Sequence, residues 1–137
     1  MRFITGLLLL ISVFTASAAP PSSPALGTRL GIDQVPELVI LSSSGDDAEA
    51  TYTVGSPKNV ETAFDVVEAH LLREGWLGHP NVTEPPAPKP GVTQQQQSFV
   101  QGGELLTLYA SRVGREDVTL QFTLVVLEAP PQLASAP

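Results

Sequence analysis

The segment 56–76, SPKNVETAFDVVEAHLLREGW, carries the strongest structural pattern in the chain. Its apolar residues recur at the spacing of one helical face: Val60, Ala63, Phe64, Val67 and Leu71. Ser56 is a suitable N-cap, and Pro57 fits the first helical position, where its missing N–H would be unpaired anyway. Gly75 is typical of a helix end, and Trp76 beyond it is placed to fold back onto that end. We therefore predict a helix over residues 57–74.

Two strands are expected before this helix. The apolar run LVIL at residues 38–41 follows a proline and predicts a well-buried strand. Residues 42–47, SSSGDD, are dense in turn-forming side chains. Residues 49–54 then alternate, with Ala50, Tyr52 and Val54 on one face. The pattern predicts a β-hairpin.

After the helix the hydrophobic pattern stops and then returns. Residues 85–90, PPAPKP, favour an extended polyproline conformation, and the four glutamines at 94–97 add no hydrophobic period. We expect a mobile loop over 77–97. Three strands follow in residues 98–101, 105–113 and 118–127, joined by the turn residues at 102–103 and 114–117.

The predicted order is therefore β-β-α-β-β-β. Hairpin connections indicate a mostly antiparallel, five-stranded sheet with one helix on one face, an α+β fold. We expect a single domain over 36–128, preceded by a flexible leader at 19–35 and followed by a disordered tail at 129–137.

The first 18 residues have the pattern of a cleavable signal peptide. Arg2 precedes the apolar core Leu7–Phe14, and Ala16 and Ala18 occupy the small-residue positions of a cleavage site. The apolar run is shorter than the ~20 residues of a membrane span. With no cysteine to carry a lipid, the chain is expected to be secreted or periplasmic, with no membrane insertion after cleavage.

Composition narrows the classes of partner. Removal of residues 1–18, whose one charged side chain is Arg2, leaves 6 basic and 14 acidic side chains, a formal charge of −8 against −7 for the whole chain. An acidic surface repels phosphate backbones, so nucleic acid is not an expected partner. The absence of cysteine excludes disulfides and thiol catalysis.

No motif in the sequence predicts catalysis or a cofactor. The serine-rich SSSG at 42–45 lacks the G-x-S-x-G pattern of a nucleophile elbow, and the two histidines are His70 on the helix and His79 in the loop. The carboxylate pairs at 46–47 and 116–117 fall in expected turns, where solvent keeps both ionised.

No metal site is predicted either. Asp46, Asp47 and Glu49 lack the spacing of a calcium loop and supply too few ligands by themselves. His70 and His79 are separated by the helix end and make a poor zinc pair.

The face of the sheet that the helix leaves uncovered is the one candidate binding surface. Its expected residues are Thr51, Thr53, Thr119, Gln121 and Thr123, with Thr107, Tyr109 and Ser111 as further candidates. Threonine has a high β-propensity, so an ordinary solvated face explains this composition. The alternative is a flat docking surface or a dimer interface.

Residues 36–76 resemble a module of small bacterial envelope proteins. The resemblance lies in a proline before the first strand, a polar turn and an alternating strand. A helix that contains an aromatic follows and ends in Leu71-Leu72-Arg73-Glu74-Gly75-Trp76. It covers about a third of the chain, and Asp65 stands where the module has a second aromatic. That family has no established activity, so the resemblance implies a fold and a non-enzymatic role.

The leading hypothesis is an exported, non-catalytic binding or structural module of the bacterial envelope or medium. It implies an unidentified protein partner or self-association. One alternative is a secreted inhibitor that places the 77–97 loop in the cleft of a hydrolase. Another is a small hydrolase that depends on His70 or His79.

Overall fold

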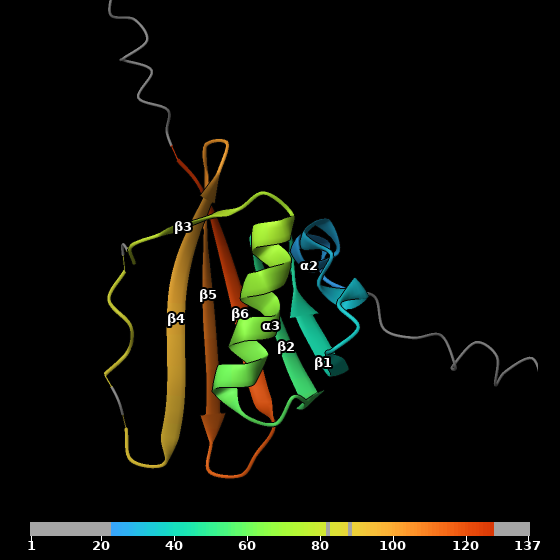
Figure 1. Ribbon diagram of the computed structural model, residues 1–137, viewed down its shortest axis with the longest axis vertical. Coiled ribbons are helices and arrows are strands. Elements are labelled where there is room, and N and C mark those ends of the chain that lie inside the picture. The colour runs from blue at the N-terminus through green and yellow to red at the C-terminus, as the bar shows by residue number, and fades with distance from the viewer. Residues whose placement is uncertain (1–22, 82, 88, 128–137) are drawn as a thin grey trace, which may run out of the picture.

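The computed structural model describes residues 23–81, 83–87 and 89–127. These residues form an α+β domain in which helix α3 lies across one face of a single antiparallel sheet (Figure 1). The strand order is β1-β2-β6-β5-β4-β3. The strands are β1 (Val39–Gly45), β2 (Glu49–Ser56), β3 (Leu77–His79), β4 (Val92–Gln101), β5 (Glu104–Val113) and β6 (Val118–Val126). The predicted fold class and antiparallel pairing are confirmed, but the sheet has six strands and not five.

Alternation along the three central strands separates a core face from an outer face. The core-face residues of β2, β5 and β6 are buried: Ala50, Tyr52, Val54, Leu106, Leu108, Ala110, Val118, Leu120 and Phe122. Their sequence neighbours point to the other side because successive side chains of a strand alternate. The register, for example Tyr52 opposite Leu120 and Leu120 opposite Ala110, aligns the buried residues in rows across the sheet. Core and outer faces therefore follow directly from the sequence pattern.

Helix α3 spans Val60–Arg73, so the predicted start at Pro57 is wrong. Ser56 cannot act as the cap because it is paired with Val39 in the sheet. Asn59 caps the helix instead, and its side chain accepts a 2.7 Å hydrogen bond from the Thr62 N–H. At the other end the Trp76 N–H donates to the Leu71 carbonyl, and the indole is buried, as the sequence indicates.

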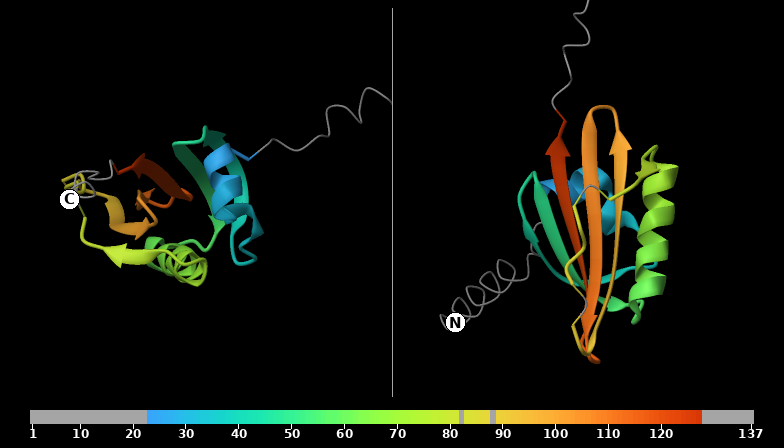
Figure 2. Two further views of the ribbon diagram at one scale, coloured as in Figure 1. Left: turned by 90° about the horizontal axis from the view of Figure 1, so that it is seen from above. Right: turned by 90° about the vertical axis from the view of Figure 1, so that its left-hand side faces the viewer.

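A second helical segment completes the cover of the core face. Helix α2 (Ala25–Leu30) and the 3₁₀ turn η1 (Ile32–Gln34) place Leu26, Leu30 and Ile32 in the core. Helix α2 packs against β2, and its end is hydrogen-bonded to α3; Figure 2 (left) shows α2 on the β1–β2 side of the domain. The expected flexible leader is therefore wrong for residues 25–34, which bury apolar area that α3 is too narrow to cover. Residues 1–18, the expected signal peptide, and 129–137, the expected tail, lie outside the described residues.

The contact between α2 and the sheet is very close at one residue. The Tyr52 hydroxyl reaches the backbone of Gly27, 3.4 Å from the Ser23 hydroxyl, and its ring packs edge-on against Phe122. Burial of the phenol raises the pKa of Tyr52. A second contact joins α3 to the end of α2: His70 Nε2 donates a 2.7 Å hydrogen bond to the Leu30 carbonyl. These contacts fix α2 between the sheet and the end of α3.

Two further predictions are corrected at the edges of the sheet. β1 is an edge strand whose Val39 and Leu41 are 53% and 54% exposed, so the expected buried strand is wrong. It also continues through the three serines to Gly45, which moves the turn to residues 46–48. At the opposite edge the expected 77–97 loop contains β3 and more than half of β4. The strand β3 was missed because a three-residue strand has too few residues to show alternation.

Gly27→Ala should lower the free energy of unfolding by about 1–3 kcal/mol, the usual range for overpacking. A Cβ at this position would lie 1.5 Å from the Tyr52 hydroxyl oxygen. In a Tyr52→Phe background, Gly27→Ala should lower the free energy of unfolding by a smaller amount, because the hydroxyl oxygen that lies closest to the added Cβ is absent. Urea unfolding followed by fluorescence of the single tryptophan measures both effects.

Gly78→Ala is the matched control for this substitution. Its added Cβ would have the Gln97 amide nitrogen, 4.0 Å away, as its nearest neighbour. The control should therefore leave stability nearly unchanged. Equal losses for the two alanine variants would contradict the close contact between α2 and Tyr52.

Candidate functional site

The five residues predicted for the outer face lie together on two adjacent strands. The β2–β6 register sets Thr51 opposite Gln121 and Thr53 opposite Thr119, and Thr123, opposite Glu49, is the next β6 residue on the same face. The four threonines are half-buried and Gln121 is exposed. The further candidates Thr107, Tyr109 and Ser111 extend the same face onto β5. The structure thus places all the predicted residues on one surface.

A connection between β3 and β4 adds a wall to this surface. We call residues 80–91 the strap; it includes the proline-rich sequence, and its residues 82 and 88 are not described. The strap runs beside β4 for the length of that strand (Figure 1). It ends in a tight turn, in which the Val92 N–H donates to the Lys89 carbonyl over 3.1 Å. The strap therefore stays close to the sheet instead of projecting from it.

Side-chain amides of β4 hold the strap in place. Gln96 Nε2 donates a 2.9 Å hydrogen bond to the Thr83 carbonyl, and Gln94 Nε2 donates to the Pro86 carbonyl. Asn81 secures the start of the strap through a 3.3 Å bond from its amide to the Gln96 carbonyl. Gln94 and Gln96 are two residues apart, so their side chains lie on the same face of the strand. These two glutamines of the run therefore donate hydrogen bonds to the strap.

The strap and strands β4, β5 and β6 line an open groove of about 460 Å³. Figure 2 (right) shows the strap running along the strands on this side of the molecule. The groove is lined by Thr83, Glu84, Pro86, Gln96, Leu105, Thr107, Tyr109, Gln121, Thr123 and Val125. Two of the five predicted residues, Gln121 and Thr123, belong to the lining, whereas Thr51, Thr53 and Thr119 lie beyond it. The candidate site is thus narrower than the predicted face and shifted toward β5.

The lining combines apolar surface with neutral hydrogen-bonding groups. Leu105 and Val125 are directly opposite each other at one end of the groove, and Tyr109 and Gln121 are opposite each other at the other end. The Tyr109 hydroxyl donates a 2.9 Å hydrogen bond to Gln94 Oε1. Gln94 thereby links the strap to the aromatic ring of the groove floor and fixes the ring's position. Glu84 is the charged member of the lining set. Such a site suits a neutral or cationic ligand that combines apolar groups with hydrogen-bonding groups.

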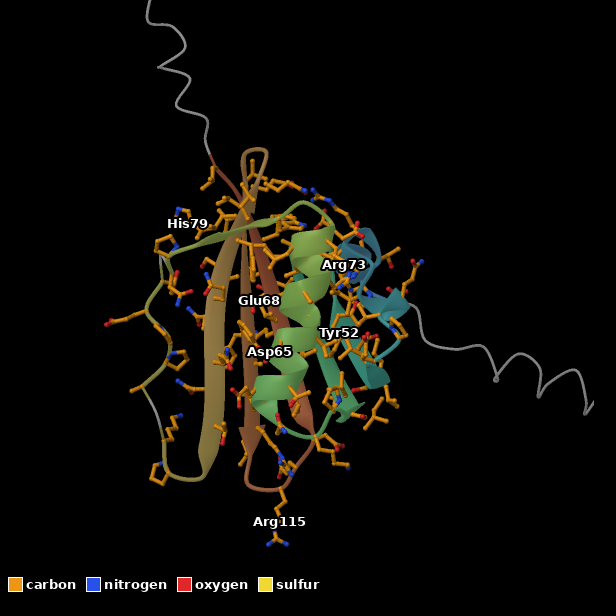
Figure 3. All side chains as sticks on the ribbon, viewed as in Figure 1. Tyr52, Asp65, Glu68, Arg73, His79 and Arg115 are labelled. Atoms are coloured by element: carbon orange, nitrogen blue, oxygen red, sulfur yellow. The ribbon has the colours of Figure 1, made fainter. Side chains whose placement is uncertain are left out.

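The residues weighed for catalysis do not come together. His70 is bonded to the Leu30 carbonyl beside α2, while His79 Nδ1 donates to the neighbouring Pro80 carbonyl. Figure 3 places His79 at the edge of the sheet where the strap begins, on the far side of α3 from α2. The serines at 42–44 lie on β1, at the opposite edge. In the described part of the chain, the residues considered for a hydrolase therefore do not form a common site.

Of the acidic residues at 46–49, Asp46 has a structural role in the β1–β2 turn. Asp46 Oδ1 accepts hydrogen bonds from the N–H groups of Ala48 and Glu49, at 2.8 and 3.0 Å. Over residues 23–127, gaps apart, no group of three or more acidic or histidine side chains is placed to hold a metal ion. Within the same ranges no helix has the length and apolar character needed to span a membrane.

Sequence reasoning missed the strap and the role of the glutamines. The one available signal was that the glutamine run at 94–97 continues without a turn residue into the predicted strand at 98–101, since four identical residues show no alternation. A hydrophobic period is absent because this part of β4 makes polar contacts with the strap. Comparisons with protein families, with curated proteins and with solved structures find no match for this chain.

Replacement of Gln94 and Gln96 by methionine should release the strap and leave the sheet folded. Methionine has nearly the length of glutamine but no amide to donate to the strap carbonyls. In a ¹⁵N relaxation measurement, the heteronuclear NOE of Thr83, Glu84 and Ala87 should fall because the strap gains motion, while the values for β5 and β6 stay unchanged.

Gln95→Met is the matched control, because Gln95 pairs with Ala110 and lies on the core face, away from the strap. It should leave the heteronuclear NOE of the strap residues unchanged. If the double variant also leaves those values unchanged, the glutamine contacts do not hold the strap.

Proposed function

We propose that this chain is an exported, non-catalytic binding module of the bacterial envelope or medium, and that its ligand occupies the groove between the strap and the sheet. The groove itself is the observation on which the proposal depends. It combines a fixed aromatic ring, apolar surface and neutral donors and acceptors in one concave site. Export rests on the signal-peptide pattern of residues 1–18. The negative net charge of the chain disfavours a polyanionic ligand.

Pre-organisation supports binding at this site over binding elsewhere on the outer face. Gln94 and Gln96 hold the wall of the groove through hydrogen bonds that do not depend on a ligand. A ligand that enters a preformed site loses less free energy to ordering of the protein. Thr53 and Thr119, elsewhere on the outer face, lie outside the groove lining.

The inhibitor hypothesis is less well supported, because residues 77–97 already make contacts within their own domain. Residues 77–79 and 92–97 belong to the sheet, and the strap carbonyls between them accept hydrogen bonds from β4. Insertion into a hydrolase cleft would require these bonds to break or the strap to enter with the whole sheet edge. We therefore favour the groove as the functional site.

Affinity capture with the chain 19–137 tests the proposal directly. The bait is incubated with the envelope and secreted fractions of the source organism, and bound species are compared between variants. Thr123→Lys places a long charged side chain in the groove and should abolish capture of the specific ligand. Thr53→Lys makes the same change on the same face outside the groove lining and should retain it.

Circular dichroism first establishes that both variants are folded, since both threonines are half-buried. Capture that is lost equally in the two variants would assign binding to the whole face. Capture that is retained equally would exclude this face as the binding site.

A further inference from the structure

The outer face of the sheet already binds one proline-rich segment, which is part of its own chain. The strap sequence at 84–87 is EPPA, and the carbonyls of Thr83 and Pro86 accept hydrogen bonds from two glutamines of β4. Proline has no N–H, so a proline-rich backbone can offer only acceptors and needs donors from its partner. Glutamine amides provide those donors. The chemistry of this face is therefore that of a receptor for extended, proline-rich backbone.

The groove beside the strap repeats these features without an occupant from the described chain. Gln121 is exposed in the groove and supplies an amide donor, and Thr107 and Thr123 supply hydroxyls. Pro86 and the Tyr109 ring provide flat apolar surfaces of the kind on which proline rings pack. A second proline-rich segment would thus meet on β6 an amide donor like those that the strap meets on β4, with the threonine hydroxyls as further donors.

The dimensions and charge of the groove fit the same class of ligand. From the Leu105–Val125 pair to the Tyr109–Gln121 pair the floor runs four residues, about 13 Å at 3.3 Å per residue. A polyproline helix rises about 3.1 Å per residue, so four to five ligand residues span this length. Glu84 lies at the wall and adds negative charge to a chain that is already acidic. A lysine or arginine in the ligand would complement it.

We infer that the groove binds a proline-rich, basic peptide segment of another protein in an extended polyproline conformation. This inference rests on the proposed function and specifies its ligand class. The backbone carbonyls of the peptide accept hydrogen bonds from Gln121 and the groove threonines. Its prolines pack between Pro86 and Tyr109, and its basic side chain lies near Glu84. The rigid conformation of such a peptide limits the entropy lost on binding.

The direct test is calorimetric titration of the chain 19–137 with an acetylated and amidated peptide of sequence PPAPKPPAP. A flexible peptide, GSAGKGSAG, has the same length and charge and should not bind. Gln121→Leu removes the amide donor at an exposed residue and should weaken binding of the proline-rich peptide about three- to tenfold, the net value of one hydrogen bond. Thr53→Leu, on the same face outside the groove, should leave the affinity unchanged.

A double-mutant cycle tests the orientation of the peptide. Replacement of its lysine by norleucine should weaken binding about two- to fivefold, as expected for a partly exposed ion pair. In Glu84→Gln the two peptides should bind equally. An equal preference for lysine in both proteins would overturn the assigned contact with Glu84.

Failure of this inference is distinguishable from failure of the proposed function. No binding of the proline-rich peptide, or equal binding of the flexible peptide, overturns the ligand class. Binding of a neutral oligosaccharide such as cellohexaose, weakened by Gln121→Leu, would overturn it in favour of a carbohydrate ligand. In either case, loss of ligand capture by Thr123→Lys but not by Thr53→Lys would still support the groove as the binding site.

Discussion

The hydrogen bonds from Gln94 and Gln96 to the strap carbonyls determine whether this protein has a groove at all. Without the strap, the outer face beside β4 would have no wall, and the floor residues Leu105, Tyr109 and Val125 would be more open to water. Each such bond contributes only about 0.5–1.5 kcal/mol net. Two such bonds can hold the strap against the sheet because its prolines restrict the unfolded conformations. The strap therefore loses less entropy when it is fixed. Gln94 also accepts from the Tyr109 hydroxyl, which joins the wall and the floor of the groove.

One face of the sheet forms the hydrophobic core, and the opposite face carries the groove of the proposed function. The core face buries aliphatic and aromatic residues under α3 and α2, and the close contact of Gly27 with Tyr52 limits how far α2 can shift. The outer face contributes less to the core and is free to carry polar side chains. Because β5 and β6 are central strands paired on both sides, the groove floor is held rigidly. Binding residues on a fixed scaffold can be positioned accurately, as the proposed function requires.

Much of the fold could be predicted from residue patterns, and the failures have physical causes. The stripe from Val60 to Leu71 and the alternation in β2, β5 and β6 each encode one buried face, so these elements were predictable. The helix start was missed because Ser56 and Asn59 are both good caps, and only pairing in the sheet shows that Ser56 is unavailable. The strap was missed because polar contacts between glutamines and carbonyls leave no hydrophobic period in the sequence. The position of Gln121 and Thr123 on the outer face was predictable because strand alternation alone places them outside the core.

A nuclear Overhauser measurement tests the central claim, that the strap lies on the outer face of the sheet and forms one wall of the groove. In the labelled chain 19–137, the ring protons of Tyr109 should show cross-peaks to the side-chain protons of Gln94, and the side-chain amide protons of Gln94 to protons of Pro86. The same spectra should show non-random chemical shifts for Thr83 and Glu84. Random-coil shifts throughout the strap, with no cross-peak from it to β4 or β5, would contradict the groove and every inference drawn from it.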